Sequence, residues 1–299
     1  MSQAAVTTSN DLPAQPRKRR SALQILLRSK VSLLCFLVIL IFVLLAVFAP
    51  YLPIADPNAI NSPARLAGVG QGGYIFGADE LGRDLFSRIV WGGRISLSAG
   101  LGAAGVALLI GTTVGLVAGF YGRWVDALLM RVTDVVLAFP SVLLAIGIVA
   151  ALGPGLFNAM LAVAIAGFPL YARVVRGSVL TVRELDYVEA ARSLGFSNWR
   201  IMIRHILPNV IAPILVTLSL DIGQKIVTTS SLSFLGLGAQ PPIADWGNMI
   251  ASGREYIRTA PHLVILPGAV IFAIVLVLNI LGDRLRDILD PRTRSGSAK

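Results

Sequence analysis

The stretch from Val135 to Ala172 reads VVLAFPSVLLAIGIVAALGPGLFNAMLAVAIAGFPLYA, and its 38 residues include no charged side chain. A membrane-spanning helix needs about 20 predominantly apolar residues, so this stretch is too long for one span. The tripeptide Gly153-Pro154-Gly155 interrupts it, and a helix interior tolerates glycine and proline badly. The sequence therefore predicts a helical hairpin in a membrane, with spans over 135–152 and 156–172.

Four further uncharged stretches lie outward from this hairpin: Val31–Ala55, Ile95–Gly122, Ile226–Ala244 and Thr259–Gly282. The stretch that begins at Ile226 extends back to about residue 210, and its distal part, rich in glycine and proline, is typical of a loop. Each stretch predicts one span. The six predicted spans are 31–50, 96–119, 135–152, 156–172, 210–233 and 262–282.

The composition supports the same class of protein. Hydrophobic residues make up 55% of the 299 residues and charged residues 14%, with a mean hydropathy of +0.76. Soluble domains carry roughly 25% charged residues, so this chain has too little polar sequence to cover soluble cores. One cysteine and two histidines exclude a disulfide framework and a Cys/His zinc cluster. None of the four lysines follows a glycine, which excludes a phosphate-binding P-loop. We therefore predict an all-α polytopic membrane protein with six transmembrane helices.

The positions of Lys and Arg predict the orientation, because cytoplasmic loops carry an excess of positive charge. With the N-terminus inside, 19 of the 26 Lys and Arg residues fall on the cytoplasmic side and 6 on the other, while Lys225 lies within a span. We therefore expect both termini in the cytoplasm. The apolar run of the first span is longer than the about 7–15 residues of a signal peptide, so we expect a retained anchor.

The spans divide the chain into a basic cytoplasmic tail (1–30), the first span with an extracytoplasmic loop (31–94), a core of five spans (95–283) and a cytoplasmic C-terminal tail (284–299). The basic cluster Arg17–Arg20 is more typical of an orientation signal beside lipid than of a nucleic-acid patch. The two long outer loops, 51–95 and 234–261, contain Pro, Gly and aromatic residues, and we expect them to form folded caps.

The cytoplasmic loop over 173–209 is long for a connection between helices. Glu184–Leu194 contains good helix formers. The apolar residues at helical spacing are Leu185, Val188, Ala191 and Leu194. Gly195 is placed to end this helix in a left-handed conformation, and Ser197 to cap a second helix that Pro208 ends. The resulting helix–glycine–helix element is either an amphipathic hairpin on the lipid surface or a docking element for a partner.

Two charges within the fifth span need an explanation. Asp221 and Lys225 are four residues apart and so lie on one face of a helix. Each would cost about 2.5–3.5 kcal/mol near the bilayer centre, so neither is expected to face lipid. Either the two neutralise each other inside a packed interface, or they form part of a pore wall with the hydroxyl residues Thr228 and Ser231.

A stripe of small residues marks the second span. Gly111, Gly115 and Gly119 recur every four residues and so lie on one face of the helix. Such a face permits close approach of another helix. We expect that helix to come from the same chain rather than from another subunit.

Four blocks of the sequence resemble one family. Glu189-Ala190-Ala191-x3-Gly195, followed after nine residues by His205-Ile206-Leu207-Pro208, resembles the EAA loop of ABC importer permeases, which has isoleucine at the position of His205. The other blocks are Gly77-x-Asp79-x-x-Gly82-Arg83-Asp84-x-x-Ser87-Arg88 with Gly93-x-x-Ser96-Leu97, Ser231–Pro242 with Trp246-Gly247, and Gly282-Asp283-x-Leu285-Arg286-Asp287-x-Leu289-Asp290-Pro291. Together they are similar to the second permease subunit of the dipeptide/oligopeptide/nickel importer family, from about residue 20 to residue 292.

This resemblance implies a type I ABC importer permease fold in a bacterial cytoplasmic (inner) membrane. It implies a pore formed with a sister permease, two ATPase subunits that dock on the EAA loop, and an extracytoplasmic solute-binding protein that delivers a peptide-like cargo. The implied docking residues are Glu189, Ala190, Ala191, Gly195, Leu207 and Pro208. We expect no catalytic residue, metal or cofactor in this chain, because ATP hydrolysis belongs to the partner subunits.

Other functions remain open at this point. The same importer class also carries nickel complexes and other small solutes. A secondary transporter driven by an ion gradient is the main alternative class, but it should show paired repeats with broken helices at mid-membrane, and no repeat is evident. An intramembrane enzyme needs a convergent set of reactive side chains, which Cys35 and Asp221 do not form.

Overall fold

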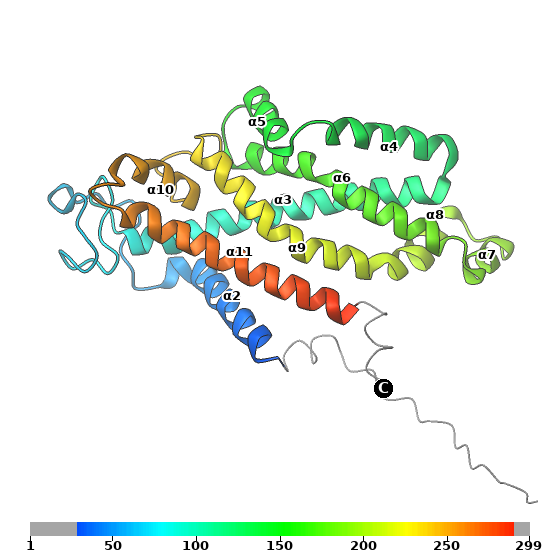
Figure 1. The fold of residues 1–299 in the computed structure, drawn as a ribbon, viewed down its shortest axis with the longest axis horizontal. Coiled ribbons are helices and arrows are strands. Elements are labelled where there is room, and N and C mark those ends of the chain that lie inside the picture. The colour runs from blue at the N-terminus through cyan, green and yellow to red at the C-terminus, as the bar shows by residue number, and fades with distance from the viewer. Residues whose placement is uncertain (1–28, 290–299) are drawn as a thin grey trace, which may run out of the picture.

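The computed structural model of the protein describes residues 29–289 as helices joined by loops (Figure 1). The predicted N-terminal tail, except its last two residues, and the end of the C-terminal tail lie outside these residues. The main helices are α2 (Lys30–Phe48), α3 (Leu85–Tyr121), α4 (Arg123–Leu137), α5 (Ser141–Leu152), α6 (Leu156–Val182), α7 (Asp186–Ser193), α8 (Asn198–Ile201), α9 (Leu207–Phe234), α10 (Trp246–Gly253) and α11 (His262–Leu289).

Within residues 29–289, five helical segments are long and apolar enough to cross a membrane: α2, α3, α6, the continuous segment that ends in α9, and α11. The pair α4 and α5 makes a sixth when it is counted as one broken span, because the two helices meet at an angle of 91°. The prediction of one straight span over 135–152 is therefore wrong, as is that of a loop over 120–134. The break falls at Phe139-Pro140, since proline lacks the N–H group of a helix interior and restricts the residue before it.

The predicted hairpin turn is confirmed. Helix α5 ends at Leu152, Gly153 adopts a φ of +92°, and α6 begins at Leu156. Helix α6 continues ten residues beyond its predicted end at 172, to Val182. Two arginines that were expected in a loop therefore lie on α6 and bind carboxylates of α4, with Arg173–Asp134 at 2.8 Å and Arg176–Asp126 at 2.5 Å.

Helix α3 packs most extensively against α6, and the glycine stripe explains how. A Cβ atom at Gly115 would stand 2.5 Å from the Ala172 carbonyl oxygen, and one at Gly111 would stand 2.5 Å from that of Phe168. The two backbones therefore touch only because glycine has no side chain. The expectation that the stripe packs within the chain is confirmed.

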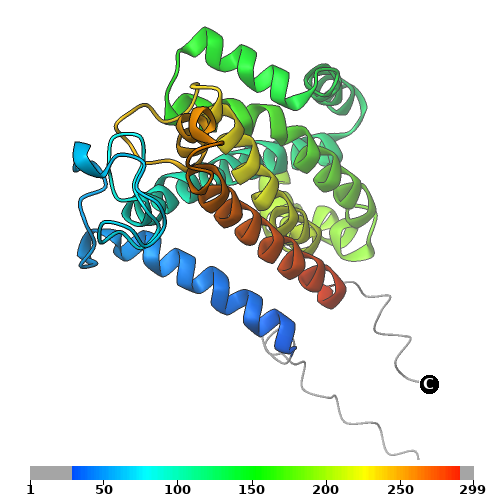
Figure 2. The same cartoon turned by 60° about the vertical axis from the view of Figure 1, so that its left-hand side comes forward.

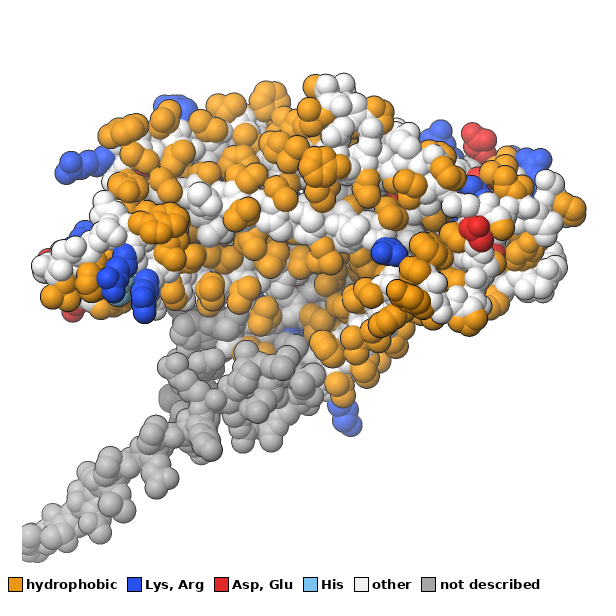
Figure 3. Space-filling view, turned by 180° about the vertical axis from the view of Figure 1, so that it is seen from behind, with side chains coloured by type: hydrophobic (Ala, Val, Ile, Leu, Met, Phe, Trp, Pro, Cys, Tyr) orange, Lys and Arg blue, Asp and Glu red, His pale blue; other side chains and the backbone are white. Residues whose placement is uncertain are grey.

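The outer surface has the polarity of a membrane protein. Figure 3 shows hydrophobic side chains across the middle of one face, with charged side chains gathered toward both ends. Helix α2 runs along the edge of the bundle beside α11 and α3 (Figure 2). Its buried residues are small, Ser32, Cys35 and Ala46, while Leu34 and Val47 are exposed. The chain is therefore a multi-pass membrane protein.

One end of the bundle carries a folded cap, as predicted. It consists of the loop over 52–84 and of α10 (Figure 1). Asp79 holds the loop, because its Oδ2 lies 2.6 Å from Arg83 Nε and 3.3 Å from Arg88 Nε. Gly82 adopts a φ of +77°, and a Cβ there would stand 1.8 Å from the Asn61 carbonyl oxygen. The ion pairs within the block Gly77–Arg88 thus attach the cap to the start of α3.

Candidate functional site

The EAA loop lies at the end of the bundle opposite the cap, where α7 and α8 project (Figure 1). Helix α7 ends as predicted, because Gly195 has a φ of +76°. The Phe196 N–H group donates to the Ala191 carbonyl oxygen at 3.2 Å, and the Gly195 N–H group to that of Arg192 at 2.9 Å. No atom of residues 29–289 would lie within 4 Å of a Cβ at Gly195. A larger residue there would therefore strain the backbone without a steric clash.

The inner face of α7 belongs to a hydrophobic core. Val188 and Ala191 are buried against Phe120 of α3, Val179 of α6 and Ile206. The loop is therefore fixed to the ends of two long helices, which a hairpin lying on lipid would not be.

Two residues predicted to share this inner face do not. Leu185 is 45% exposed and Leu194 is 73% exposed. They occupy the positions just before and just after α7, so they do not follow its register.

The second helix of the loop differs from its prediction. Ser197 caps it as expected, because its hydroxyl accepts a hydrogen bond from the Arg200 N–H group. Pro208 does not end it, however: a π-helical turn over Met202–Ile206 leads directly into α9, and Pro208 lies in the first turn of α9. Proline is tolerated there because a wider turn and a first helical turn both lack some of the usual hydrogen bonds. The loop is thus continuous with a membrane-spanning helix.

The outer face of the loop presents four of the six predicted docking residues. Glu189, Ala190, Gly195 and Pro208 are exposed, while Ala191 is buried and Leu207 is half-buried. Trp199, in the second helix of the loop, is 69% exposed. Like Leu194, it presents a large apolar side chain at the surface of the loop, which the sequence analysis did not anticipate.

One face of α9 is left open by the rest of the chain, and it is mostly polar. Its half-buried and exposed residues recur every three or four positions: Asn209, Pro213, Thr217, Leu220, Gln224, Thr228 and Ser231. The hydroxyls of Thr228 and Ser231, two predicted pore residues, donate to the carbonyl oxygens of Gln224 and Val227 at 2.8 Å. Such a polar stripe on a membrane-spanning helix is suited to facing water or another subunit rather than lipid.

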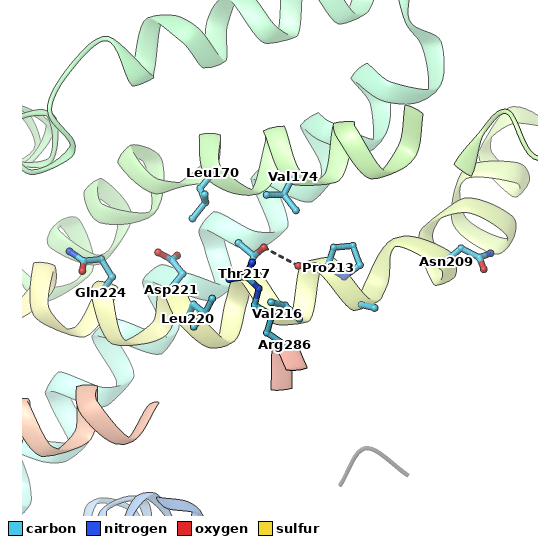
Figure 4. A pocket seen from close by; sticks show the side chains of 11 residues that line it. Leu170, Val174, Asn209, Pro213, Val216, Thr217, Leu220, Asp221, Gln224 and Arg286 are labelled. Atoms are coloured by element: carbon cyan, nitrogen blue, oxygen red, sulfur yellow. Dashed lines mark hydrogen bonds between the residues drawn. The ribbon is translucent and has the colours of Figure 1, made fainter. Parts of the chain in front are cut away.

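A cavity of about 740 Å³ lies against the half of this face nearer the EAA loop (Figure 4). Leu170 and Val174 of α6 and Arg286 of α11 complete its walls. Its polar lining comes mainly from α9, through Asn209, Thr217, Asp221 and Gln224.

The other two predicted pore residues lie between helices. The side chains of Asp221 and Lys225 are 7% and 9% exposed, with Nζ and Oδ2 3.5 Å apart. The Tyr171 hydroxyl of α6 donates to the same carboxylate oxygen at 2.9 Å. Lys225 Nζ occupies the space that a Cβ at Gly167 would need. The charges are thus shielded from lipid as expected, and Asp221 also borders the cavity.

Helix α10 is locked into the opposite end of the bundle. The Ser96 hydroxyl donates to Asp245 Oδ1 at 2.7 Å, and the Asn248 N–H group donates to Oδ2 at 3.2 Å. The Trp246 indole N–H group donates to the Ile89 carbonyl oxygen at 2.9 Å. Burial raises the pKa of the Asp245 carboxyl, although these hydrogen bonds oppose the shift. The family blocks around Ser96 and Trp246 therefore hold the cap to α3.

The raised pKa of Asp245 predicts a pH-dependent stability. Such a group contributes stability that is present below its unfolded pKa of about 3.9 and is lost as the pH rises through the raised folded pKa. We expect the thermal unfolding midpoint of the wild type in detergent, measured relative to Asp245→Asn, to fall as the pH rises from about 4. The same change at exposed Asp56 controls for the loss of one acid from the cap. A difference between Asp245→Asn and wild type that stays constant from pH 4 to 8 would contradict this prediction.

Solved structures with a similar fold define the class. A chain of the MetNI methionine ABC transporter, in an inward-facing conformation, superposes with a TM-score of 0.55 and 17% identity over 68% of this chain and 97% of that chain. A chain of an amino acid ABC transporter gives a TM-score of 0.51 and 20% identity over 66% of this chain and 92% of that chain. The protein has the fold of a type I ABC importer permease.

Sequence relatives give the family. The family model described as "binding-protein-dependent transport system inner membrane component" matches residues 111–295. A second model, described as "N-terminal TM domain of oligopeptide transport permease C", matches residues 19–68. The dipeptide transport system permease protein DppC of Alkalihalophilus pseudofirmus is 46% identical over 92% of this chain and 90% of its own length. The glutathione transport system permease protein GsiD of Pectobacterium atrosepticum is 46% identical over 90% of this chain and 89% of its own length. The chain belongs to the family of binding-protein-dependent transport system inner membrane components, which confirms the resemblance found in the sequence.

Proposed function

We propose that the protein is a permease subunit of an ABC importer that takes up short peptides across the bacterial cytoplasmic membrane. The observation that carries the proposal is the continuity of the EAA loop with α9. The helix that bears the open polar face begins where the docking element ends. The names of the relatives, which are permeases of dipeptide and glutathione transport systems, support a peptide cargo.

The partners follow from which surfaces are open. A sister permease would cover the polar face of α9 and close a pore around it. ATPase subunits would dock on the exposed side of α7 and on Leu194 and Trp199, one ATPase to each permease. A solute-binding protein would deliver the cargo at the cap formed by 52–84 and α10.

The chain's part in transport is mechanical. ATP binding and hydrolysis take place on the ATPases, and their movement reaches this chain at α7. Because α7 shares a buried core with α3, α6 and the start of α9, the loop and these helices move together. A flexible linker would absorb the movement, whereas a packed core transmits it.

The orientation is proposed with both termini in the cytoplasm, and cysteine labelling tests it. In a Cys35→Ser background, cysteines at exposed Val69 of the cap and at exposed Glu255, just after α10, should react with an impermeant maleimide in whole cells. A cysteine at exposed Ser193 of α7 should react only after the membrane is opened. Labelling of position 193 in intact cells would show that the proposed orientation is wrong.

The cargo is tested by uptake. Cells that lack this chain should lose uptake of radiolabelled dialanine or trialanine, and the restored chain should return it. Nickel uptake is measured in the same cells. Uptake of ⁶³Ni that depends on the chain, without peptide uptake, would overturn the peptide assignment while leaving the importer class intact.

A further inference from the structure

The cavity between α6, α9 and α11 is large enough for a small ligand, and its mostly apolar lining carries a few polar side chains. Its volume of about 740 Å³ falls within the roughly 300–1,000 Å³ of small-molecule sites. It carries two charged side chains of opposite sign, Asp221 and Arg286.

Neighbouring side chains hold the Asp221 carboxylate through only one of its two oxygens, Oδ2. The Tyr171 hydroxyl and Lys225 Nζ both approach Oδ2. Within residues 29–289, no hydrogen bond reaches Oδ1. Because Lys225 already balances part of the charge, a cation that binds Asp221 from the cavity is held weakly. Weak binding suits a transport path, in which a ligand must leave as readily as it enters.

Arg286 supplies the opposite charge. It lies in the last turns of α11, is exposed, and forms no ion pair with another residue that the structure describes. It lines the same cavity as Val216 and Thr217 (Figure 4). Thr217 precedes Asp221 by four residues, which is about 6 Å along a helix. An extended dipeptide spans at most about 7 Å, so its two charged ends match this spacing.

We propose that this cavity is a transient binding site for the two charged termini of a short peptide during its passage. Asp221 Oδ1 accepts hydrogen bonds from the terminal ammonium group, and the Arg286 guanidinium binds the terminal carboxylate. Gln224, exposed three residues beyond Asp221 on the side away from Thr217, is placed to accept a second hydrogen bond from the same ammonium group. This inference rests on the proposed peptide import and adds the part of the cargo that the permease itself recognises.

Cysteine protection tests the site without relying on transport. Thr217→Cys is placed in the Cys35→Ser background of the complete importer, in inside-out vesicles without ATP. A small maleimide should label it, and millimolar dialanine should slow the labelling at least fivefold. N-acetyl-dialaninamide, which has neither charge, should not slow it. Val227→Cys, which lines a separate cavity against α11, should be unaffected by either compound.

Variants that remove one charge show which side chain binds which terminus of the peptide. Asp221→Asn keeps the oxygen that Tyr171 bonds, and Arg286→Gln lies at an exposed helix end, so the second is the safer variant for folding. Each should raise the dialanine concentration for half-protection at least tenfold, and in Arg286→Gln the labelling rate in the absence of peptide should be unchanged.

Three outcomes would overturn the proposal: no labelling of the Thr217→Cys variant, equal protection by N-acetyl-dialaninamide, or full protection in Arg286→Gln. Peptide uptake by the wild-type importer is measured in parallel. Normal uptake without protection would reject this site and leave the proposed function standing, whereas loss of both would reject the two together.

Discussion

Reversing the charge of Glu189 should release the ATPase subunits and abolish transport. Glu189 is exposed in the first turn of α7, where a carboxylate also interacts favourably with the helix dipole. In Glu189→Lys, a like charge brought against the partner surface can cost several kcal/mol. We expect co-purified ATPase and cargo uptake to fall below about a tenth of wild type, with normal insertion of the chain. Glu184→Lys is the matched control, because Glu184 lies outside α7 and pairs only with Arg183 at the surface.

The turn at Gly195 gives an independent test of the same element. Its φ of +76° costs a residue with a side chain about 1–2 kcal/mol, and more for a β-branched one. Gly195→Val should therefore displace α7 and lose the ATPases, whereas Gly195→Asn should keep them, because asparagine tolerates this conformation. Wild-type uptake and ATPase retention in both Glu189→Lys and Gly195→Val would show that the loop does not couple the subunits.

Removing Asp221 alone should damage the protein more than removing its partner with it. Asp221→Ala leaves Lys225 charged and buried against Gly167, and breaking a buried pair in this way costs about 3–5 kcal/mol. The double variant Asp221→Ala/Lys225→Met leaves no buried charge and should recover most of that loss. The measurements are the amount of folded protein in the membrane and its unfolding midpoint in detergent.

An exposed pair on the same bundle provides the control for this experiment. The side chains of Arg173 and Asp134 are 58% and 54% exposed, so Asp134→Ala should cost at most about 1 kcal/mol. If the single variant Asp221→Ala is as stable as the double variant, the two charges are not coupled.

The sequence alone determined the features that depend on neighbours along the chain. Long apolar runs gave the membrane class, Gly153-Pro154-Gly155 gave the hairpin turn, and Gly195 gave the left-handed end of α7. The spacing of four residues placed Asp221 and Lys225 on one helix face, and the structure pairs them there. Hydropathy, backbone restriction and helical spacing act locally, so the structure agrees with each of these predictions.

The tertiary structure decided what depends on segments far apart in the sequence. Whether a proline ends a helix depends on the hydrogen bonds around it: Pro140 breaks a predicted span, whereas Pro208 is accepted at the start of α9. Whether an apolar residue is covered depends on the helices that reach it, which is why Leu194 is exposed although its helical spacing placed it with Val188 and Ala191. The cavity was beyond the sequence for the same reason, because its walls come from α6, α9 and α11, and only their packing brings Arg286 to the cavity that Asp221 borders.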